Sequence, residues 1–393
     1  MNVYVTGIGV ISAIGNNVDE NYNSLTSLNH GIGPVQFSNN KKTHLVGNVK
    51  LSDEAIIEKY SVKNLPISRT SLLGIIAASE AWGSNKHMKS IRTGLISSTS
   101  VGGMDKSEKY YRQLIQHEDI DNSLILTHDN GNTSEKIANF LGLEGYVNTL
   151  STACSSSLNA IMLGARMIQQ DKLDRVIVGG SDAFTEFTLN GFDSLMIYSD
   201  EMCKPFDENR NGLNLGEGAG FLVLESNRSI KETKNTQLCE LVGWCNAADA
   251  FHQTASSPEG KGATLAIEGA LKQANLSPND IDYINAHGTA TKNNDLSESR
   301  AIINVFKNNI PSFSSTKAFT GHTLAASGSI EVIFSILTLT KDVIFPNLNF
   351  IQPIEQTKLN PVTELTMNKK VNCVLSNSFG FGGNNSTVIL QKI

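Results

Sequence analysis

The feature that most constrains the fold of this chain is an internal repetition, because its second half follows the same order of elements as its first. Each half has an apolar helix, expected at Ser155–Gln170 and Ser329–Leu339. Each half also ends in a glycine-rich stretch before a short strand, at Gly216–Glu225 and Phe379–Leu390. A chain of 393 residues is long enough to hold two such halves.

Strands and helices alternate along both halves, which predicts an α/β fold with largely buried strands. The other main strands are expected at Val3–Val10, Arg92–Thr99, Asp174–Val178 and Ile281–Ala286. The other main helices are expected near Ser71–Trp82, Ser134–Leu141 and Lys261–Ala274. The polar segment Ser226–Gln237 is the best candidate for the join. We therefore divide the chain into residues 1–230 and 231–393, and expect the halves to pack as one body.

Composition excludes several classes of protein. Hydrophobic residues make up 40% and charged residues 18%, which is typical of a globular protein. The net charge of −6, without a basic block, argues against nucleic-acid binding. Apolar runs such as Val332–Leu339 are too short to span a membrane. The N-terminal segment lacks the basic residues of a signal peptide. Five cysteines without CxxC pairs fit reduced thiols in a cytosolic protein.

Cys154 is the candidate nucleophile. It stands in STACSSSLNA, at the start of a predicted helix. The positive end of the helix dipole and the unpaired N–H groups there favour the thiolate. Small neighbours leave room for a substrate. The alternative interpretation is a buried, inert cysteine.

Two histidines are the candidate partners of this thiol. His287 lies in INAHGTAT, where a strand runs into a Gly-Thr turn, and His322 lies just before the second apolar helix. Under the duplication His322 corresponds to Cys154, so the two side chains are expected to converge. A lone histidine is more often structural, and a Cys/His/His set can also bind zinc. The wide spacing of these residues makes a metal site the weaker interpretation.

Together these motifs resemble those of the elongating β-ketoacyl-[acyl-carrier-protein] synthases of the thiolase superfamily. The resemblance runs from VTGIGVISAIG through TACSS, KPFDENRNGLNLGEGAG, NAHGTAT and STKAFTGHTLAASG to NSFGFGGNN. It implies a thiolase-like fold in which two duplicated halves form a layered αβαβα arrangement. It also implies decarboxylative condensation of an acyl group with malonyl-carrier protein, in fatty acid, polyene or polyketide-type biosynthesis.

The resemblance implies a role for each site residue. Cys154 matches the acyl-carrying nucleophile, His287 and His322 match the catalytic histidine pair, and Lys317 matches the active-site lysine. The other matches are the gating phenylalanine whose N–H joins that of the cysteine in an oxyanion hole (Phe379), threonines that bind the phosphopantetheine arm (Thr289 and Thr291) and carboxylates that interact with the lysine (Asp295 and Glu298).

The family also sets expectations about cofactors and partners. It implies no metal and no other cofactor, because both substrates are carried on the phosphopantetheine of an acyl carrier protein. It implies a cytoplasmic homodimer, or a heterodimer with a similar ketosynthase-like chain.

Three segments depart from the family pattern. The usual Arg-Asp-Gly-Phe of the central loop is Arg210-Asn211-Gly212-Leu213 here. The run Ser61–Arg69 offers only Lys63 and Arg69 to an acidic carrier protein. The stretch Thr127–Phe140 is more polar than its family equivalent, which predicts a preferred acyl chain other than an ordinary long saturated one.

Two further functions stay open beside the synthase: another thiolase-fold acyltransferase, and one subunit of a ketosynthase/chain-length-factor pair. Thiolases characteristically replace one histidine and use a second cysteine. Chain-length factors typically lose the nucleophile. The intact set of Cys154, His287 and His322 therefore favours the synthase.

Overall fold

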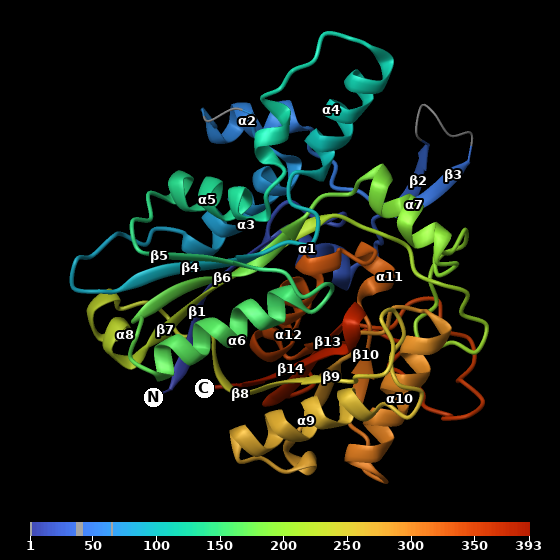
Figure 1. The fold of residues 1–393 in the computed structure, drawn as a ribbon. Coiled ribbons are helices and arrows are strands. Elements are labelled where there is room, and N and C mark those ends of the chain that lie inside the picture. The colour runs from blue at the N-terminus through green and yellow to red at the C-terminus, as the bar shows by residue number, and fades with distance from the viewer. Residues whose placement is uncertain (1, 37–41, 64–65) are drawn as a thin grey trace.

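The computed structural model describes residues 2–36, 42–63 and 66–393. Helices and strands are stacked in the order αβαβα (Figure 1). The outer helix α3 (Arg69–Trp82) covers β1 and β7, and α9 (Lys261–Ala274) covers β8 and β14 on the opposite side. Between the two β layers lie α6 (Ser156–Gln169) and α12 (Ser327–Lys341), which contact each other. This arrangement confirms the predicted layering.

The two β layers are joined in one mixed sheet, in the order β10-β9-β13-β14-β8-β1-β7-β6-β4-β5. The first half supplies β1 (Val3–Ile11), β4 (Thr93–Ser98), β5 (Tyr146–Leu150), β6 (Arg175–Asp182) and β7 (Gly218–Ser226). The second half supplies β8 (Cys239–Ala248), β9 (Tyr283–Asn285), β10 (Ser312–Ser314), β13 (Cys373–Gly380) and β14 (Asn384–Gln391). The halves meet where β1 pairs antiparallel with β8, with Val5 opposite Cys239.

Smaller elements surround this body. Two short sheets pair β2 (Ile32–Gln36) with β3 (Thr43–Gly47) and β11 (Val343–Ile344) with β12 (Thr366–Met367). The remaining α-helices are α1 (Val18–Thr26), α2 (Asp53–Tyr60), α4 (Met104–Gln116), α5 (Asn130–Leu141), α7 (Glu186–Ser194), α8 (Asn227–Thr233), α10 (Lys292–Phe306) and α11 (Lys317–Thr320). Single 3₁₀ turns are η1 (Leu124–Thr127), η2 (Pro278–Asp280), η3 (Leu324–Ala326) and η4 (Phe381–Gly383).

The main core lies around the two central helices. Helix α12 is buried along its whole length except at its last two residues, which explains why its sequence is apolar on every side. The stretch Leu324–Lys341 is long and apolar enough to cross a membrane, but 89% of it is buried inside the protein. It therefore serves here as a core helix.

The predicted elements agree with the structure to within a few residues at most ends, and α9 has the predicted bounds. One segment differs in kind. The polar stretch Ser226–Gln237, expected as a simple join, contains α8, which Ser226 caps through its side chain. The proposed boundary between residues 230 and 231 falls inside this helix, and the division into two domains stays a prediction.

Candidate active site

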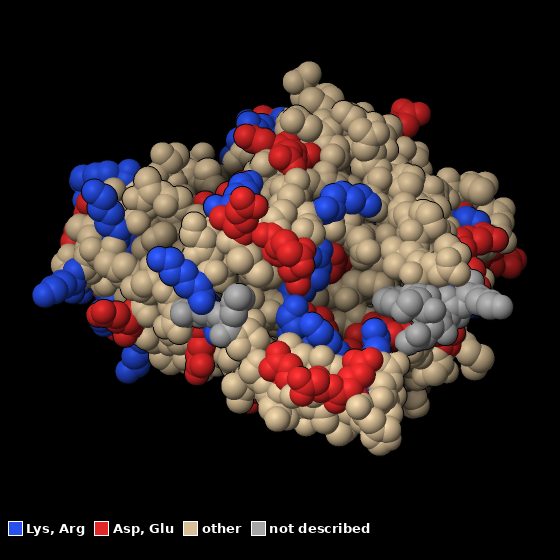
Figure 2. All heavy atoms as spheres, turned by 90° about the horizontal axis from the view of Figure 1, so that it is seen from above, with Lys and Arg blue, Asp and Glu red and all other residues tan. Residues whose placement is uncertain are grey.

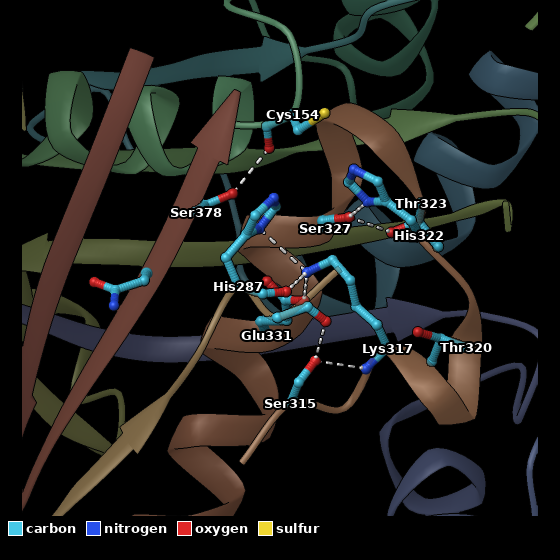
Figure 3. Close-up of polar contacts among 12 residues, drawn as sticks. Cys154, His287, Ser315, Lys317, Thr320, His322, Thr323, Ser327, Glu331 and Ser378 are labelled. Carbon is cyan, nitrogen blue, oxygen red and sulfur yellow. Dashed lines mark hydrogen bonds and ion pairs between the residues drawn. The ribbon is translucent and has the colours of Figure 1, made fainter. Parts of the chain in front are cut away.

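The nucleophile Cys154 lies on a tight loop between β5 and α6. The preceding residue, Ala153, has a φ of +52°, a left-handed conformation that is uncommon for a residue with a side chain. The end of β13 passes close by, since a Cβ on Gly380 would lie 3.2 Å from the Cys154 nitrogen. The Ser378 hydroxyl donates to the Cys154 carbonyl at 2.9 Å. This hydrogen bond joins strand β13 to the backbone of the nucleophile loop (Figure 3).

Burial dominates the chemistry of this thiol. Cys154 is 6% exposed, and burial raises the pKa of its thiol to about 12. The Lys317 charge and the backbone N–H groups of Cys154 and Phe381 lower the pKa by less than burial raises it. The N–H groups beside the sulfur favour the thiolate, as expected, but burial has the larger effect and favours the neutral thiol.

The second N–H group beside the sulfur belongs to Phe381, in η4, and not to Phe379 as expected. Phe379 lies two residues earlier, near the end of β13. Its ring packs in the core, and its centre lies 5.7 Å from the centre of the His287 ring. The motif F-G-F-G-G offers two phenylalanines, and the sequence alone does not decide between them. The structure places the N–H of Phe381 beside the Cys154 sulfur, and sequence reasoning missed this residue.

Lys317 determines the state of His287. Its Nζ lies 3.2 Å from His287 Nδ1, donates to the His287 carbonyl at 2.6 Å, and forms an ion pair with Glu331. Burial, followed by the Lys317 charge, lowers the pKa of His287 well below its usual value. A protonated lysine can only donate hydrogen bonds. His287 Nδ1 must therefore accept, and the ring proton sits on Nε2.

His322 has a different kind of partner. Its Nδ1 lies 2.8 Å from the Ser327 hydroxyl, which can donate or accept. Burial, followed by the Lys317 charge, lowers the pKa of this imidazole well below its usual value as well. The two rings lie 5.4 Å apart, centre to centre, and nearly perpendicular (Figure 3). The site therefore holds two neutral imidazoles, and only His287 has a fixed tautomer.

The carboxylate that pairs with Lys317 is Glu331, and the expectation that Asp295 and Glu298 do so is wrong. Asp295 accepts from the N–H groups of Phe206 and Ala290, and Glu298 accepts from those of His287 and Gly288. These two carboxylates hold the turn that carries His287. A signal for Glu331 was available, because it is the lone charged residue within the apolar run Ser329–Leu339.

A cavity of about 270 Å³ connects these groups to the surface. Its lining includes Cys154, His287 and His322, and also the predicted arm-binding residues Thr289 and Thr291. The two threonine hydroxyls lie 3.0 Å apart. The structure thus brings together all the predicted residues that would touch a substrate.

The unusual central loop also lines this cavity, through Asn211, Gly212 and Leu213. Arg210 is buried and donates to the carbonyls of Asp207, Thr291 and Lys292, at 2.9, 3.3 and 2.7 Å. Three hydrogen bonds therefore fasten this loop to its own turn and to the start of α10.

Of the two basic residues in the run Ser61–Arg69, Arg69 is paired within the protein. Its guanidinium forms ion pairs with Glu217 and Asp53, and its side chain is 17% exposed, so little of it is open to a carrier protein. Lys63 is exposed, and residues 64 and 65 of the same run lie outside the described residues. On the face seen from above, Lys and Arg are interspersed with Asp and Glu (Figure 2).

The alternative of a metal site finds no support in the geometry. In the part of the chain that the structure describes, no group of three His, Cys, Asp or Glu side chains is arranged to hold a metal ion.

The chain is similar to known proteins along most of its length. The β-ketoacyl synthase N-terminal domain matches residues 1–229, and the C-terminal domain of the same family matches residues 238–351. The 3-oxoacyl-[acyl-carrier-protein] synthase 2 of Staphylococcus aureus (strain MRSA252) is 32% identical over 410 residues, covering 100% of this chain and 98% of the relative. The protein of the same name from Coxiella burnetii is 31% identical, with the same coverage.

Solved structures give the same result. The ishigamide ketosynthase/chain length factor superposes with a TM-score of 0.93 at 27% identity, covering 100% of this chain and 99% of the other. A ketosynthase in complex with its chain length factor, from Xenorhabdus doucetiae, superposes with a TM-score of 0.86 at 33% identity, covering 100% and 98%. These similarities confirm the predicted fold class.

Proposed function

The chain belongs to the β-ketoacyl synthase family of condensing acyltransferases, and we propose that it joins an acyl group on Cys154 to the malonyl group of a carrier protein. One observation carries this proposal: a single cavity holds a buried thiol, beside which lie two backbone N–H donors, and two neutral imidazoles. The thiol and the two N–H donors suit acyl transfer, and the two imidazoles suit stabilisation of an enolate.

In the first half-reaction the sulfur of Cys154 attacks the acyl thioester of the carrier. The carbonyl oxygen becomes an oxyanion, which the N–H groups of Cys154 and Phe381 stabilise. The thiol is protonated beforehand, so a base must take its proton. His287 Nε2 already carries a proton, whereas His322 can place its proton on Nδ1 toward Ser327 and accept at Nε2. His322 is therefore the base, and the carrier thiol leaves with that proton.

In the second half-reaction the malonyl thioester loses CO2 and leaves an enolate. The Nε2–H of His287, and that of His322 once its proton has returned to Nε2, donate to the enolate oxygen. The enolate carbon then attacks the acyl carbonyl on Cys154, and the sulfur leaves. The product is a 3-oxoacyl thioester on the carrier, and the departing thiolate takes a proton from water to regenerate the cysteine.

The carrier is an acyl carrier protein in this proposal, as the name of the curated relatives states for them. Its phosphopantetheine arm enters along Thr289 and Thr291, which line the cavity. The arm supplies no redox or metal chemistry, because it only holds the thioester in place. The five free cysteines fit a reducing, cytoplasmic location for this reaction.

A second ketosynthase-like subunit completes the proposal, in the first instance a second copy of this chain. Strand β5 is at the end of the sheet, and its residues Tyr146 and Val147 are exposed. An exposed apolar edge strand favours pairing with another chain. The Xenorhabdus relative was solved with its chain length factor, so such a factor is the other candidate partner. Native mass spectrometry of the purified protein distinguishes a homodimer from a chain that stays single until the factor is added.

The test of the reaction uses purified protein, a panel of acyl carriers and malonyl carrier with an isotopic label on the carboxylate. We expect labelled CO2 and a 3-oxoacyl carrier of matching mass in equal amounts. Acyl exchange between carriers without CO2 would instead identify a simple acyltransferase. The panel also tests acyl preference, since a clear preference for long saturated chains would contradict the prediction from Thr127–Phe140.

A further inference from the structure

A polar cluster behind the nucleophile loop has no role in the mechanism described so far. It consists of Asn159 on α6, Asn246 on β8 and Asn384 at the start of β14, together with Ser155 and Ser386. Three segments that are far apart in the sequence thus meet beside Cys154. The cluster also joins the two halves of the chain, because Asn159 comes from the first half and the other two asparagines come from the second.

The side-chain oxygen of Asn384 is the centre of this cluster. It accepts hydrogen bonds from the Ser155 hydroxyl at 2.7 Å, from Asn159 Nδ2 at 2.9 Å and from Asn246 Nδ2 at 2.6 Å. Asn159 Nδ2 also reaches the Thr152 hydroxyl at 2.8 Å. One carbonyl oxygen therefore ties β8 to both sides of the Cys154 loop.

Asn384 also stands directly after the turn that carries the Phe381 N–H. The two residues between them, Gly382 and Gly383, have φ values of +82° and +75°. The turn closes the hairpin in which Gly380 lies opposite Asn384, but its two glycines are conformationally permissive and leave the direction of the Phe381 N–H to its surroundings. Its outer side is fixed by bonds from the Gly382 N–H to the Gln253 carbonyl and from the Asp249 N–H to the Gly383 carbonyl. On the side that faces Cys154, the turn is linked to the nucleophile loop by the hydrogen bond between Asn384 and Ser155.

We propose that Asn384 is a positioning residue for the oxyanion hole: its side-chain oxygen sets the place of the Phe381 N–H relative to the Cys154 N–H. Ser155 is the neighbour of one donor, and Asn384 lies three residues from the other. The hydrogen bond between them fixes the separation of the two donors. This inference rests on the proposed acyl transfer at Cys154. The Ser378 bond to the Cys154 carbonyl acts in parallel from the other end of the turn.

The test compares two substitutions of similar size. Asn384→Leu removes the acceptor, whereas Asn384→Asp keeps an oxygen where all three donors can reach it. We expect Asn384→Leu to lower the kcat for acylation of Cys154 about 10- to 100-fold, somewhat less than the loss of a whole oxyanion-hole donor. The KM for the acyl carrier should stay within about twofold, since the mouth of the cavity is unchanged. Asn384→Asp should stay within about threefold of the parent.

Alkylation by iodoacetamide separates positioning from simple disruption. Alkylation needs the Cys154 sulfur but forms no oxyanion. We therefore expect the fold-decrease in the alkylation rate of Asn384→Leu to be smaller than the fold-decrease in its acylation rate, by a factor of about ten or more. Equal losses in both reactions would mean that the Cys154 loop has collapsed, and would overturn the proposal. An unchanged acylation rate, or an equal loss in Asn384→Asp, would overturn it as well. A parent protein that is alkylated but never acylated would instead refute the proposed function.

Discussion

The beginnings of α6 and α12 occupy equivalent places in the two halves, yet they control their reactive groups by different means. At the start of α6, Cys154 contacts backbone N–H groups and the hydroxyl of Ser378, without a charged hydrogen-bond partner among the described residues. Before α12, the Lys317–Glu331 ion pair lies beside the imidazoles. The site around Cys154 therefore stabilises charge with fixed dipoles, one of which, the Phe381 N–H, comes from the second half. The site around the histidines uses a buried cation to fix the tautomer of a neutral ring.

This difference explains how one duplicated fold performs two half-reactions. Acyl transfer needs donors at a place where charge develops briefly, and preorganised backbone N–H groups serve that purpose without a counterion. Decarboxylation needs an imidazole that donates reliably, and an ammonium group on Nδ1 guarantees the proton on Nε2. Changes in the two regions should therefore have separable effects.

The largest effect is expected from removing the nucleophile. Cys154→Ala should abolish both acylation and condensation, because Cys154 supplies the only thiol among the described residues that line the cavity. The thermal unfolding midpoint should stay close to that of the parent, since the thiol makes few contacts that alanine loses. Residual condensation above background in this variant would show that Cys154 is not the residue that carries the acyl chain.

The next effect separates the two histidines. His287→Ala should lower decarboxylation of malonyl carrier about 100-fold or more while leaving acylation of Cys154 largely intact. His322→Ala should lower both, because His322 is the ring free to accept the thiol proton. Rates of labelled CO2 release and of acyl-enzyme formation are measured side by side. Equal profiles for the two variants would contradict this division of roles.

Breaking the buried ion pair should act on stability as well as on activity. Lys317→Met leaves Glu331 without its partner in the core, and such a loss typically costs about 3–5 kcal/mol. It should also release His287 Nδ1 and slow decarboxylation. The double variant Lys317→Met/Glu331→Gln should recover much of the stability but not the decarboxylation rate. Chemical denaturation and CO2 release provide the two readouts, and parallel recovery of both would contradict a role for Lys317 in fixing the tautomer.

The last prediction concerns pH and needs no substitution in the site. Burial raises the pKa of the Cys154 thiol to about 12, so below that pH the neutral thiol predominates and the thiolate fraction falls about tenfold per pH unit. The rate of iodoacetamide alkylation at Cys154 should therefore keep rising between pH 8 and about pH 10. A plateau beginning below pH 8 would show that the helix dipole dominates after all. Cys154→Ala supplies the background from the other cysteines.

Much of the fold could be predicted because burial and periodicity act locally. The apolar runs at α6 and α12 and the strand at β1 carry their own signal. The predictions that failed depend on distances between segments. Whether Phe379 or Phe381 faces the thiol depends on how the chain turns after β13. Whether a carboxylate meets Lys317 depends on how α12 packs, and Glu331 reaches it from within that helix.

Motifs in the sequence predicted which residues form the site. They did not predict the protonation states of these residues or their ion-pair partners. The start of a helix favours a thiolate, but the depth of burial of Cys154 becomes known only from the packed structure. Arg69 likewise looked available to a carrier protein, and Asp53 and Glu217 hold it inside. Burial and partner identity are properties of the assembled fold, which a local pattern does not contain.

The most direct test of the account is intact-protein mass spectrometry after incubation with a panel of acyl-carrier thioesters, followed by mapping of the modified peptide. We predict a mass increase of one acyl group, located on Cys154, absent from Cys154→Ala and discharged when malonyl carrier is added. An adduct that persists in Cys154→Ala, or that malonyl carrier leaves in place, would contradict the proposal that this buried thiol carries the acyl chain for condensation.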